Sequence, residues 1–372
     1  MKNLVVGAGI SGAVLANLIA TELNEEVVVI DRKSAIAGSS YDYADDETGI
    51  IIHKYGPHFF HTNNKKVWDF LSKYTKWYFY FNKPNAFIEG KMVNLPFNLN
   101  SLYKAFSASK AQKIEEKLLK EFGYGANIPI LNLMQHSDED IKFLSNYIYE
   151  NVFKNYTTKQ WGITPEEIDP SVIARVPIRI SNDDRYFLDK YQGIPINGYT
   201  KMIENILNHP LITVKLNTDY KDITEKFDRI FYSGSVDELL DYKYGILPYR
   251  SLSFDIQKHN CEYYQEQAAT NYPNNFDFTR IVEHKHFLNQ KSKKTVISLE
   301  YPQKFEKDKN ERFYPIANPE NEALYKKYAD EVKQAGNIYL IGRLGAYKYY
   351  NMDIAIEKVM EFFYNSFCTE KI

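Results

Sequence analysis

The sequence is poor in cysteine: Cys261 and Cys368 are its two thiols among 372 residues. Two cysteines so far apart provide neither a disulfide framework nor a thiolate metal site that spacing could reveal. An excess of charge is also missing, since 46 Lys and Arg face 48 Asp and Glu and the formal net charge is -2. This balance gives no general attraction to nucleic acid, so an anionic ligand must be bound by local cations. We expect a cytoplasmic protein without a nucleic-acid partner.

Long apolar runs are absent as well. No uninterrupted apolar stretch reaches the roughly 18 residues that a membrane-spanning helix needs. The apolar segment 4–20 contains Asn17 and three glycines and lacks a convincing cleavage site, so we interpret it as strand, turn and helix, not as a signal peptide. We therefore expect no membrane span.

The composition that is present is typical of a soluble, folded chain, with 44% hydrophobic and 25% charged residues. The length predicts two or more globular units. Aromatic residues are abundant, with 31 Tyr and 23 Phe. Tyrosine offers a stacking face and a hydroxyl suited to nucleotides and sugars, although core packing or the codon usage of an AT-rich genome explains the same excess.

A glycine motif opens the chain. Segments 3–6 and 27–30 read as buried strands and 11–23 as a helix, and Gly7-Ala8-Gly9-Ile10-Ser11-Gly12 lies between the first strand and that helix. Asp31 ends the second strand 19 residues after Gly12, where an acid can bond ribose hydroxyls. The pattern predicts a Rossmann dinucleotide site with the pyrophosphate at the helix N-terminus. A glycine-rich turn without a ligand is the alternative.

The choice between FAD and NAD depends on the end of the chain. A buried strand at 337–341 is followed by Gly342-Arg343 and by an amphipathic helix at 353–367. Flavoproteins use such a returning turn to bring a helix N-terminus toward the flavin, where its dipole stabilises negative charge on the reduced ring. A simple NAD dehydrogenase does not need this element, so the pattern favours FAD, with a structural helix cap as the alternative.

The middle of the chain predicts two further units. Helical patterns at 65–74, 109–122 and 138–156 indicate a helical insert, and alternating segments at 251–257, 279–283 and 295–300 indicate an antiparallel sheet. The predicted fold class is α/β: a Rossmann-type FAD-binding domain with a helical insert and an antiparallel β-sheet domain. We assign to the FAD-binding domain 1–75 with 197–245 and 317–372, to the helical insert with a mobile substrate lid 98–175, and to the sheet substrate domain 76–97 with 176–196 and 246–316.

Three histidines, His53, His58 and His61, lie within nine residues and raise the question of a metal. Gly56-Pro57 makes this segment a turn and no acidic ligand follows nearby, so we predict no metal site. Histidines beside a turn are either structural donors or part of a cofactor pocket. Trp161 is by itself consistent with a surface anchor, and Arg175, Arg179 and Arg185 with solvated or salt-bridged side chains.

Several motifs together resemble one family, the bacterial UDP-galactopyranose mutases. They run in order from the first strand to the final helix: Tyr55-Gly56-Pro57-His58 with Phe60-His61-Thr62, Asn94-Leu95-Pro96-Phe97-Asn98, Tyr156 with Lys159-Gln160-Trp161-Gly162, Arg175 with Pro177 and Arg179, Tyr191-Gln192-Gly193-Ile194-Pro195 with Gly198-Tyr199-Thr200-Lys201, the segment 279–287, and Gly342-Arg343-Leu344 with Tyr347-Lys348-Tyr349. The dinucleotide motif alone is common to many oxidoreductases.

The resemblance implies an isomerase that interconverts UDP-galactopyranose and UDP-galactofuranose. In this family N5 of reduced FAD bonds to the anomeric carbon and displaces UDP, the sugar ring opens and recloses, and UDP returns. An electron donor such as NAD(P)H and a homodimer are further expectations. The rival interpretations are a flavin-dependent oxidase, a UDP-N-acetylgalactopyranose mutase, and a non-catalytic flavoprotein that binds UDP-sugars.

The resemblance also implies the site residues. The implied catalytic residues are Arg175, Arg280, His58 near the flavin and His61 near the sugar. The implied substrate-binding residues are Asn82, Phe153, Tyr156, Thr157, Gln160, Trp161 on the lid, Arg175, Tyr186, Arg280, Tyr314 and Tyr349. The implied cofactor-binding residues are Gly7, Gly9, Ser11, Gly12, Asp31, Arg32, Gly38, Ser39, His58, Gly342, Arg343, Tyr349 and Met352. Two guanidinium groups suit the two phosphates of UDP.

Two positions depart from the family pattern. Asn351 stands where an aspartate is usual, which keeps hydrogen bonding but removes a negative charge. Ala37-Gly38-Ser39 replaces the commoner Gly-Gly-Asn beside the flavin pyrophosphate. The first departure puts the usual role of that acid in doubt, but not the fold.

Overall fold

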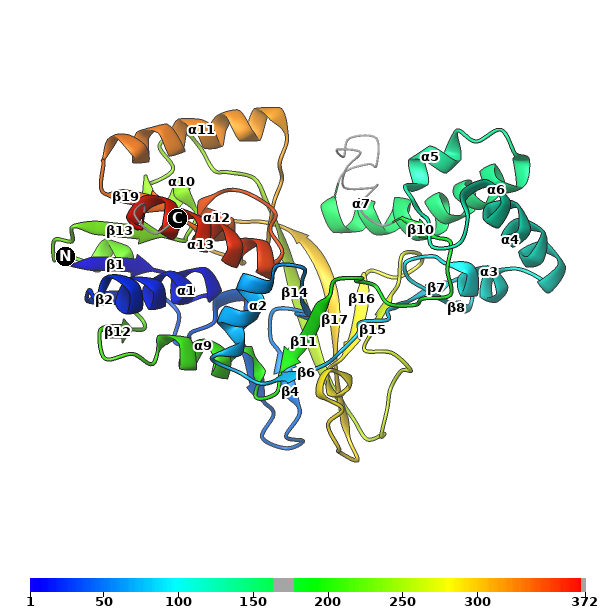
Figure 1. The fold of residues 1–372 in the computed structure, drawn as a ribbon, viewed down its shortest axis with the longest axis horizontal. Helices are drawn as coiled ribbons and strands as arrows, with labels where there is room; N and C mark the ends of the chain where they lie inside the picture. The colour runs from blue at the N-terminus through cyan, green and yellow to red at the C-terminus, as the bar shows by residue number, and fades with distance from the viewer. Residues whose placement is uncertain (163–176, 369–372) are drawn as a thin grey trace.

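The computed structural model describes residues 1–162 and 177–368. Its elements fall into three groups along the long axis of the molecule (Figure 1). A parallel sheet with helices contains both chain ends, a larger sheet lies in the centre, and a group of short helices lies at the opposite end. Arg175 falls outside the described residues.

The parallel sheet has the strand order β12 (Ile212–Lys215), β2 (Val27–Ile30), β1 (Asn3–Val6), β13 (Arg229–Tyr232) and β19 (Ile338–Leu340). Every pairing in it is parallel. The predicted Rossmann opening and the return of the chain near its C-terminus are therefore confirmed.

Alternating side chains give this sheet two buried faces. Val5, Val29 and Phe231 belong to one core cluster with residues of three helices, which are α1 (Ile10–Leu18), α9 (Gly198–Leu207) and α13 (Met352–Phe367). Leu4 and Ile30 belong to a separate cluster on the other face with Phe227. Since β1 is covered on both faces, its position, and that of the glycine turn after it, is firmly fixed.

A further core lies beneath α11 (Pro319–Gln334). Tyr328 and Val332 of α11 pack with Tyr347 and with Val236 of α10 (Val236–Leu239). The short helix α12 (Gly342–Gly345) joins β19 to α13, and a π-helical turn at Ile19–Leu23 ends α1. Among the described residues, no helix combines the length and apolar character that crossing a bilayer requires.

The central sheet has seven strands, in the order β18 (Tyr314–Pro315), β14 (Tyr249–His259), β17 (Thr295–Lys304), β16 (Arg280–Glu283), β15 (Ala269–Asn271), β7 (Asn85–Ile88) and β8 (Lys91–Asn94). The prediction of an antiparallel sheet was wrong for one pair, because β15 and β7 run parallel. These two strands come from distant parts of the chain, so no hairpin forces them to be antiparallel.

Smaller sheets connect the groups. In one, β11 (Tyr191–Pro195) pairs with β5 (Phe60–Thr62) and with β6 (Trp77–Tyr78). The others are β3 (Asp42–Ala44) with β4 (Ile51–His53), and β9 (Asn127–Ile128) with β10 (Ile178–Arg179). The helix α2 (Lys65–Ser72) follows β5, and short 3-10 turns lie at Gly38–Ser40, Tyr220–Asp222 and His284–Leu288.

The helical insert contains α3 (Leu99–Ala105), α4 (Ala108–Phe122), α5 (Ile130–Met134), α6 (Glu139–Ile148) and α7 (Asn155–Trp161). A π-helical segment at Tyr149–Lys154 joins α6 to α7, so the helix predicted at 138–156 is present and continues to Trp161. Asp138 caps its start by accepting the amides of Asp140 and Ile141. The insert has its own core, which also includes Ile88 and Val93 of the central sheet.

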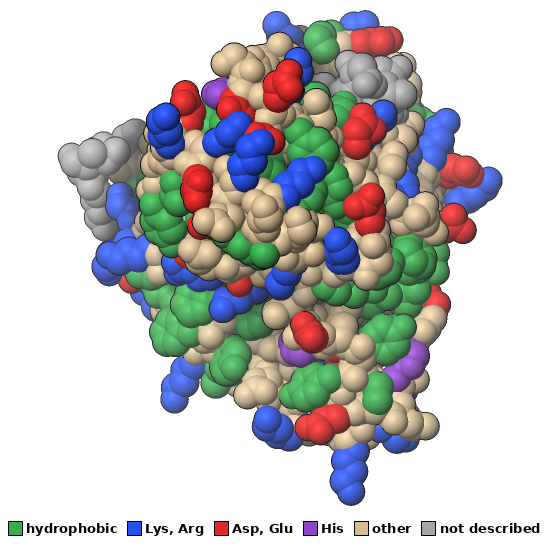
Figure 2. Space-filling view, turned by 90° about the vertical axis from the view of Figure 1, so that its right-hand side faces the viewer, with side chains coloured by type: hydrophobic (Ala, Val, Ile, Leu, Met, Phe, Trp, Pro, Cys, Tyr) green, Lys and Arg blue, Asp and Glu red, His purple; other side chains and the backbone are tan. Residues whose placement is uncertain are grey.

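The end of the molecule that carries the insert shows Lys, Arg, Asp, Glu and apolar side chains interspersed (Figure 2). Neither sign of charge dominates this face, as the balanced composition predicted. The division into three units with the boundaries given above stays a prediction.

Candidate functional site

One cavity of about 830 Å³ brings the predicted site residues together. Every predicted cofactor-binding residue lines it, and so does every predicted substrate-binding or catalytic residue within the described ranges. Arg175 and most of the expected lid fall in 163–176 and lie outside those ranges. The cavity therefore joins the predicted dinucleotide end to the predicted nucleotide-sugar end.

The glycine turn at the dinucleotide end leaves no room for a Cβ at Gly12. A Cβ at Gly12 would lie 2.0 Å from the Gly7 carbonyl oxygen and 3.0 Å from Val5 Cγ1, so α1 could not pack this closely on β1 with any other residue. Gly7 has φ +106°, a backbone conformation that L side chains rarely adopt. Asp31 is fixed beside the turn because its carboxylate accepts the Ala8 and Lys33 amides, both at 2.9 Å. This cradle fits a dinucleotide.

The returning turn approaches the same helix. Gly342 has φ +71°, and a Cβ there would lie 3.2 Å from Ser11 Cβ. The next helix, α13, has Asn351 as its N-cap, and Asn351, Met352 and Asp353 line the cavity. The positive end of the α13 dipole thus faces the cavity, where it would stabilise negative charge on a bound ring.

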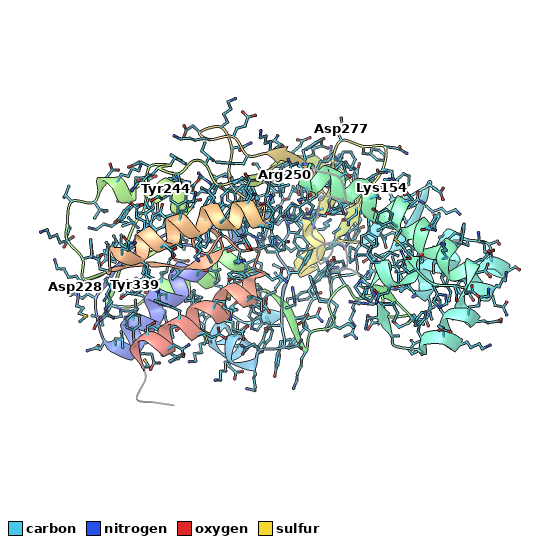
Figure 3. The ribbon with its side chains drawn as sticks, turned by 90° about the horizontal axis from the view of Figure 1, so that it is seen from above. Lys154, Asp228, Tyr244, Arg250, Asp277 and Tyr339 are labelled. Atoms are coloured by element: carbon cyan, nitrogen blue, oxygen red, sulfur yellow. The ribbon has the colours of Figure 1, made fainter. Side chains whose placement is uncertain are left out.

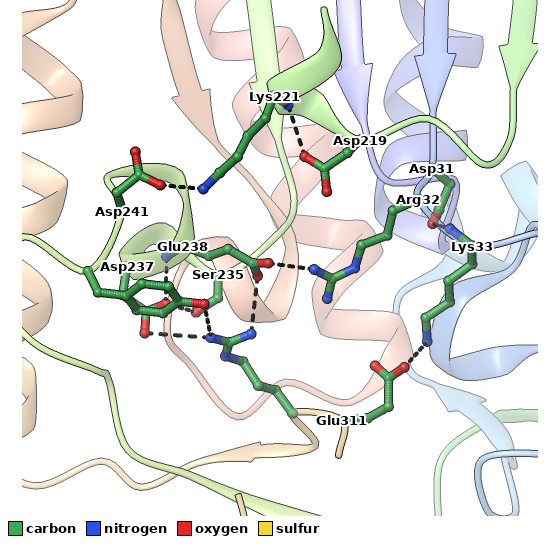
Figure 4. A network of polar contacts seen from close by, with 12 residues as sticks. Asp31, Arg32, Lys33, Asp219, Lys221, Ser235, Asp237, Glu238, Asp241 and Glu311 are labelled. Atoms are coloured by element: carbon green, nitrogen blue, oxygen red, sulfur yellow. Dashed lines mark hydrogen bonds and ion pairs between the residues drawn. The ribbon is translucent and has the colours of Figure 1, made fainter. Parts of the chain in front are cut away.

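Beside Asp31, charged side chains connect the two sheets (Figure 4). Glu238 accepts from Arg32 at 2.5 Å and from Arg312 at 3.1 Å. Lys33 pairs with Glu311 at 3.0 Å. Residues 311 and 312 precede β18 of the central sheet. These ion pairs therefore connect the central sheet to the segment that follows β2, at the wall of the cavity.

His58 lies where the two ends of the cavity meet. Its Nδ1 lies 2.9 Å from the Gly56 carbonyl oxygen, so it donates there and leaves Nε2 as an acceptor. Burial lowers the pKa of His58 to about 4, and the charges of Arg343 and Arg280 act in the same direction. The His58 amide donates to Nδ1 of His53, a fully buried ring. His58 is therefore neutral at physiological pH and fixed in orientation.

His61 is held by a carboxylate and an aromatic ring. Its Nδ1 lies 3.0 Å from Asp189 Oδ2, and Asn63 donates to the other oxygen of Asp189 at 2.9 Å. The imidazole stacks on Phe187 with a centroid separation of 3.6 Å. Nδ1 is thus engaged, and Nε2 is the nitrogen available to a ligand.

Arg280 is paired with a buried carboxylate. Its Nη2 lies 2.6 Å from Glu300 Oε2, and the Glu300 side chain is 1% exposed. Burial opposes the charge of Arg280, but Glu300 outweighs it and raises the pKa of the guanidinium above its usual value. Among the described residues, Arg280 Nε and Glu300 Oε1 have no hydrogen-bond partner. Such buried, unpaired polar atoms at a cavity wall indicate a polar ligand.

Aromatic residues surround this arginine. Tyr314, Tyr349 and Trp161 of α7 form a cluster in which each ring contacts the other two: the centroid separations are 5.3 Å for Tyr314–Tyr349, 6.2 Å for Trp161–Tyr314 and 6.4 Å for Trp161–Tyr349. Burial raises the pKa values of the Tyr156 and Tyr314 hydroxyls above their usual value, so both stay protonated and can donate. Flat rings beside a permanent cation suit a nucleobase joined to phosphate.

Comparison with known proteins identifies the family. A family model described as UDP-galactopyranose mutase matches residues 151–349, and one described as NAD(P)-binding Rossmann-like domain matches 5–74. A protein of Klebsiella pneumoniae named probable UDP-galactopyranose mutase is 35% identical over 97% of this chain and 93% of its own. The chain belongs to the UDP-galactopyranose mutase family.

Other known proteins are also similar to this chain. A dTDP-fucopyranose mutase of Escherichia coli is also 35% identical, over 97% of both chains, and the UDP-galactopyranose mutase of Mycoplasma genitalium is 34% identical over 95% of this chain and 91% of its own. A crystal structure of reduced UDP-galactopyranose mutase has the same fold, with a TM-score of 0.72, 15% identity, and coverage of 100% of this chain and 94% of that chain. A putative protoporphyrinogen oxidase from an Exiguobacterium species matches with a TM-score of 0.62, 12% identity, and coverage of 97% and 98%.

Within this family member, one arginine differs from its prediction. Arg179 is not solvated and forms no salt bridge with any described residue: it is 8% exposed, lines the cavity, and donates to the carbonyls of Arg185 and Tyr186, the latter at 2.6 Å. It therefore holds the backbone that presents Tyr186. Arg185 pairs with Asp183 at 2.6 Å, as the prediction of a salt-bridged side chain required.

Sequence reasoning missed the residues that hold the site together. Glu300 lies directly across from Arg280 in the β16–β17 pairing. The register of these two strands, had it been known, would have identified Glu300 as the partner of Arg280. Asp189 is separated from His61 by 128 residues, so spacing gave no signal. Among the described residues, no group of His, Cys, Asp or Glu could hold a metal ion.

Proposed function

We propose that the protein is an isomerase that interconverts UDP-galactopyranose and UDP-galactofuranose, with reduced FAD as cofactor. One observation carries the proposal: the dinucleotide cradle and the aromatic, cationic end line the same cavity of about 830 Å³. A flavin bound in the cradle could thus face the sugar of a bound nucleotide. Reduced flavin supplies a nucleophilic nitrogen for the anomeric carbon, so a side-chain nucleophile is not needed.

The arginines would act on the leaving group. Negative charge grows on UDP as its bond to the sugar breaks, and a preorganised cation stabilises that change. Arg280 suits this role because Glu300, 2.6 Å away, holds it in one orientation and it stays charged at any working pH. We assign the second phosphate contact to Arg175, with Tyr186, Tyr314 and Tyr349 as hydroxyl donors.

The histidines would orient the reacting groups. Neutral His58, with Nδ1 bound to Gly56, would present an acceptor nitrogen to a bound flavin. His61, held through Nδ1 by Asp189, presents Nε2 to a sugar hydroxyl and can accept its proton during ring closure. The base would stack on Phe153 and Tyr156, next to Thr157 and Gln160, and Asn82, which also lines the cavity, would contact the substrate.

A second substrate has a specific observation in its favour, since the Escherichia coli relative named dTDP-fucopyranose mutase is as similar as the Klebsiella protein. Thymine adds a methyl group to the base, and fucose lacks the 6-hydroxyl. We keep UDP-galactose as the main substrate because the family model and the Klebsiella and Mycoplasma relatives agree on it. UDP-N-acetylgalactosamine is expected to be a weaker substrate.

The test is a product analysis. The purified protein should be yellow and release FAD on denaturation. After dithionite reduction it should convert UDP-galactopyranose to the furanose, detected by chromatography, faster than dTDP-fucopyranose or UDP-N-acetylgalactosamine, while the oxidised protein should be inactive. Peroxide and an oxidised product would indicate an oxidase, UDP binding without conversion a binding protein, and bound NAD without flavin would remove the proposal.

Two further expectations are tested on the same preparation. NADPH and NADH replace dithionite in the assay, and either one should sustain turnover if it is the electron donor. Size-exclusion chromatography with light scattering tests the expected homodimer.

A further inference from the structure

The helix α7 carries three of the residues assigned to the nucleoside, Tyr156, Thr157 and Gln160, and it ends at Trp161. A lysine on the same helix, Lys159, reaches across to the central sheet. Its Nζ donates to three backbone carbonyls of the loop between β15 and β16, those of Tyr272 at 2.6 Å, Phe276 at 3.0 Å and Phe278 at 3.1 Å. All three ammonium protons are thereby used, which no other side chain can reproduce with one atom.

That loop leads directly to the arginine assigned to the pyrophosphate. The loop is closed by a hydrogen bond from the Tyr272 amide to the Thr279 carbonyl at 2.8 Å, and the Thr279 amide donates to the Glu300 carbonyl at 2.8 Å. The strand β16 then begins at Arg280. The position of the loop therefore sets where the Arg280 side chain enters the cavity.

A second cation holds the end of α7. Arg250 of β14 donates from Nε to the Gln160 carbonyl at 2.9 Å and from Nη2 to the Lys159 carbonyl at 3.2 Å. Arg250 is 9% exposed and forms no ion pair with any residue in the described ranges. Its positive charge therefore interacts with carbonyl oxygens at the C-terminal end of α7. Arg250 lies opposite Tyr314 in the β14–β18 pairing.

Lys159 thus connects α7 to the loop before β16, which begins at Arg280, and Arg250 connects α7 to β14, which pairs with the strand that carries Tyr314. Figure 3 shows Arg250 and Asp277 where α7 meets the central sheet, with Lys154 toward the helical insert. A third link is polar but neutral, because the Asn155 side chain donates to that of Asn274 at 2.7 Å.

We propose that Lys159, together with Arg250, is a positioning residue that fixes the spacing between the nucleoside-binding helix and the pyrophosphate-binding residues Arg280 and Tyr314. The inference rests on the proposed function, because it needs a nucleoside diphosphate to span the two parts. We call the contacts of Lys159 and Arg250 with α7 and the central sheet the clamp. Without the clamp, α7 and the sheet can move relative to each other, so UDP binding is weakened by the entropy that is lost when they become fixed.

The clamp has an expected pH dependence. Burial lowers the pKa of Lys159 to about 8, and the Asp277 carboxylate acts in the opposite direction. Of the other groups on the packed elements, Arg250 contacts the Lys159 carbonyl, and burial raises the pKa of the Tyr272 hydroxyl above its usual value. Loss of a proton from Lys159 removes one of three donors. UDP binding should therefore weaken as the pH rises through about 8.

The experiment compares Lys159→Met with Lys154→Met in flavin-loaded protein. Lys154 lies just before α7 and pairs on the surface with Glu150 at 2.9 Å, so its loss should be neutral. Titration calorimetry with UDP should give a Kd about tenfold higher for Lys159→Met, roughly the loss of one or two charged hydrogen bonds, and an unchanged Kd for Lys154→Met. KM should rise more than kcat falls. An unchanged Kd in Lys159→Met would overturn the proposal.

A pH series separates positioning from general damage. Between pH 7 and pH 9 the Kd for UDP should rise more steeply in the wild type than in Lys159→Met. The variant has no lysine to titrate at this position, so its pH profile measures the contribution of other groups, including the uracil itself. Identical pH profiles would contradict the proposal. If Lys159→Met loses flavin, Lys159→Gln repeats both measurements. A wild-type protein that does not bind UDP would overturn the proposed function as well.

Discussion

The two ends of the cavity are built in different ways. At the dinucleotide end the decisive groups are backbone atoms and glycines within a short stretch, where a Cβ at Gly12 would come within 2.0 Å of Gly7. At the nucleotide-sugar end they are side chains from distant segments, such as His61 with Asp189 and Arg280 with Glu300. The glycine cradle for the pyrophosphate is thus a local property of the chain, whereas substrate binding depends on how its parts are assembled. Substitutions should separate the two.

The largest expected effect is on turnover at the nucleotide-sugar end. Arg280→Ala should lower turnover of the reduced protein by at least roughly a hundredfold, the effect of losing one donor that acts on transition-state charge. We expect the same of Arg175→Ala, although Arg175 lies outside the described residues. The measurement is steady-state turnover at saturating UDP-galactofuranose, with flavin content determined for each variant.

Arg185→Ala is the matched control, because this arginine pairs with Asp183 and does not line the cavity. Its turnover should stay near normal. Arg179 cannot serve, since it holds the backbone of Tyr186. Near-normal turnover in both Arg175→Ala and Arg280→Ala would refute the pyrophosphate assignment.

At the dinucleotide end, Gly12→Ala should remove most of the flavin. Its Cβ cannot be accommodated unless α1 moves away from β1, and that movement opens the pyrophosphate cradle. Flavin content after gel filtration is the readout. Gly49→Ala is the control, because Gly49 has φ +69° and a Cβ there meets no atom within 4 Å, so it carries backbone strain without a clash. Equal flavin loss in both variants would show that general destabilisation, and not the clash at the cradle, is responsible.

The contrast also explains what the sequence could predict. Local patterns predicted three features of the dinucleotide end: the turn from Gly7 to Gly12, Asp31, and the return at Gly342. They could do so because backbone conformation and strand burial are reflected in regular patterns of residue types along the sequence. Three strands of the central sheet, β14, β16 and β17, were predicted from alternation, but the parallel β7–β15 pair was not, since register and direction between distant strands depend on tertiary packing.

The nucleotide-sugar residues were known only through the family resemblance. From composition and spacing alone, Trp161 remained consistent with a surface anchor and Arg280 with any strand residue. Glu300 and Asp189, which hold Arg280 and His61, carry no local signal. Side chains that meet across the fold cannot be paired without the strand register that brings them together.

Two histidines with lowered pKa values, His58 in the cavity wall and His284 in the 3-10 turn after β16, should make the fold sensitive to acid. Burial lowers the pKa of His58 to about 4 and that of His284 to about 3, while in the unfolded chain a histidine titrates near 6.5. The unfolded state therefore binds protons first as the pH falls below about 6.5, and the free energy of unfolding should decrease by about 1.4 kcal/mol per pH unit for each histidine down to its folded pKa.

Urea unfolding at pH 7 and pH 5 measures this loss. His284→Asn should show a smaller decrease than the wild type. His209→Asn is the control, since His209 is a half-exposed histidine whose ring accepts the Leu211 amide at 3.2 Å. An equal decrease in all three proteins would contradict the role of the buried rings.

The smallest expected effect is that of Asn351→Asp. Asn351 is the N-cap of α13 at the cavity wall, where a carboxylate would favour the helix but repel negative charge on a reduced flavin. These opposing effects are each within about 1 kcal/mol, so turnover should change less than about fivefold with flavin retained. Loss of flavin would show that this position is structural.

The central claim is that one cavity brings a reduced flavin to a nucleotide-linked sugar. The most direct test follows UDP-galactopyranose under anaerobic conditions with protein whose flavin is either fully oxidised or fully reduced. The account predicts that the reduced form produces UDP-galactofuranose over many turnovers while its flavin spectrum stays reduced at the end, and that the oxidised form is inactive. Furanose formation by the oxidised protein, or net reoxidation of the flavin in step with the sugar, would contradict it.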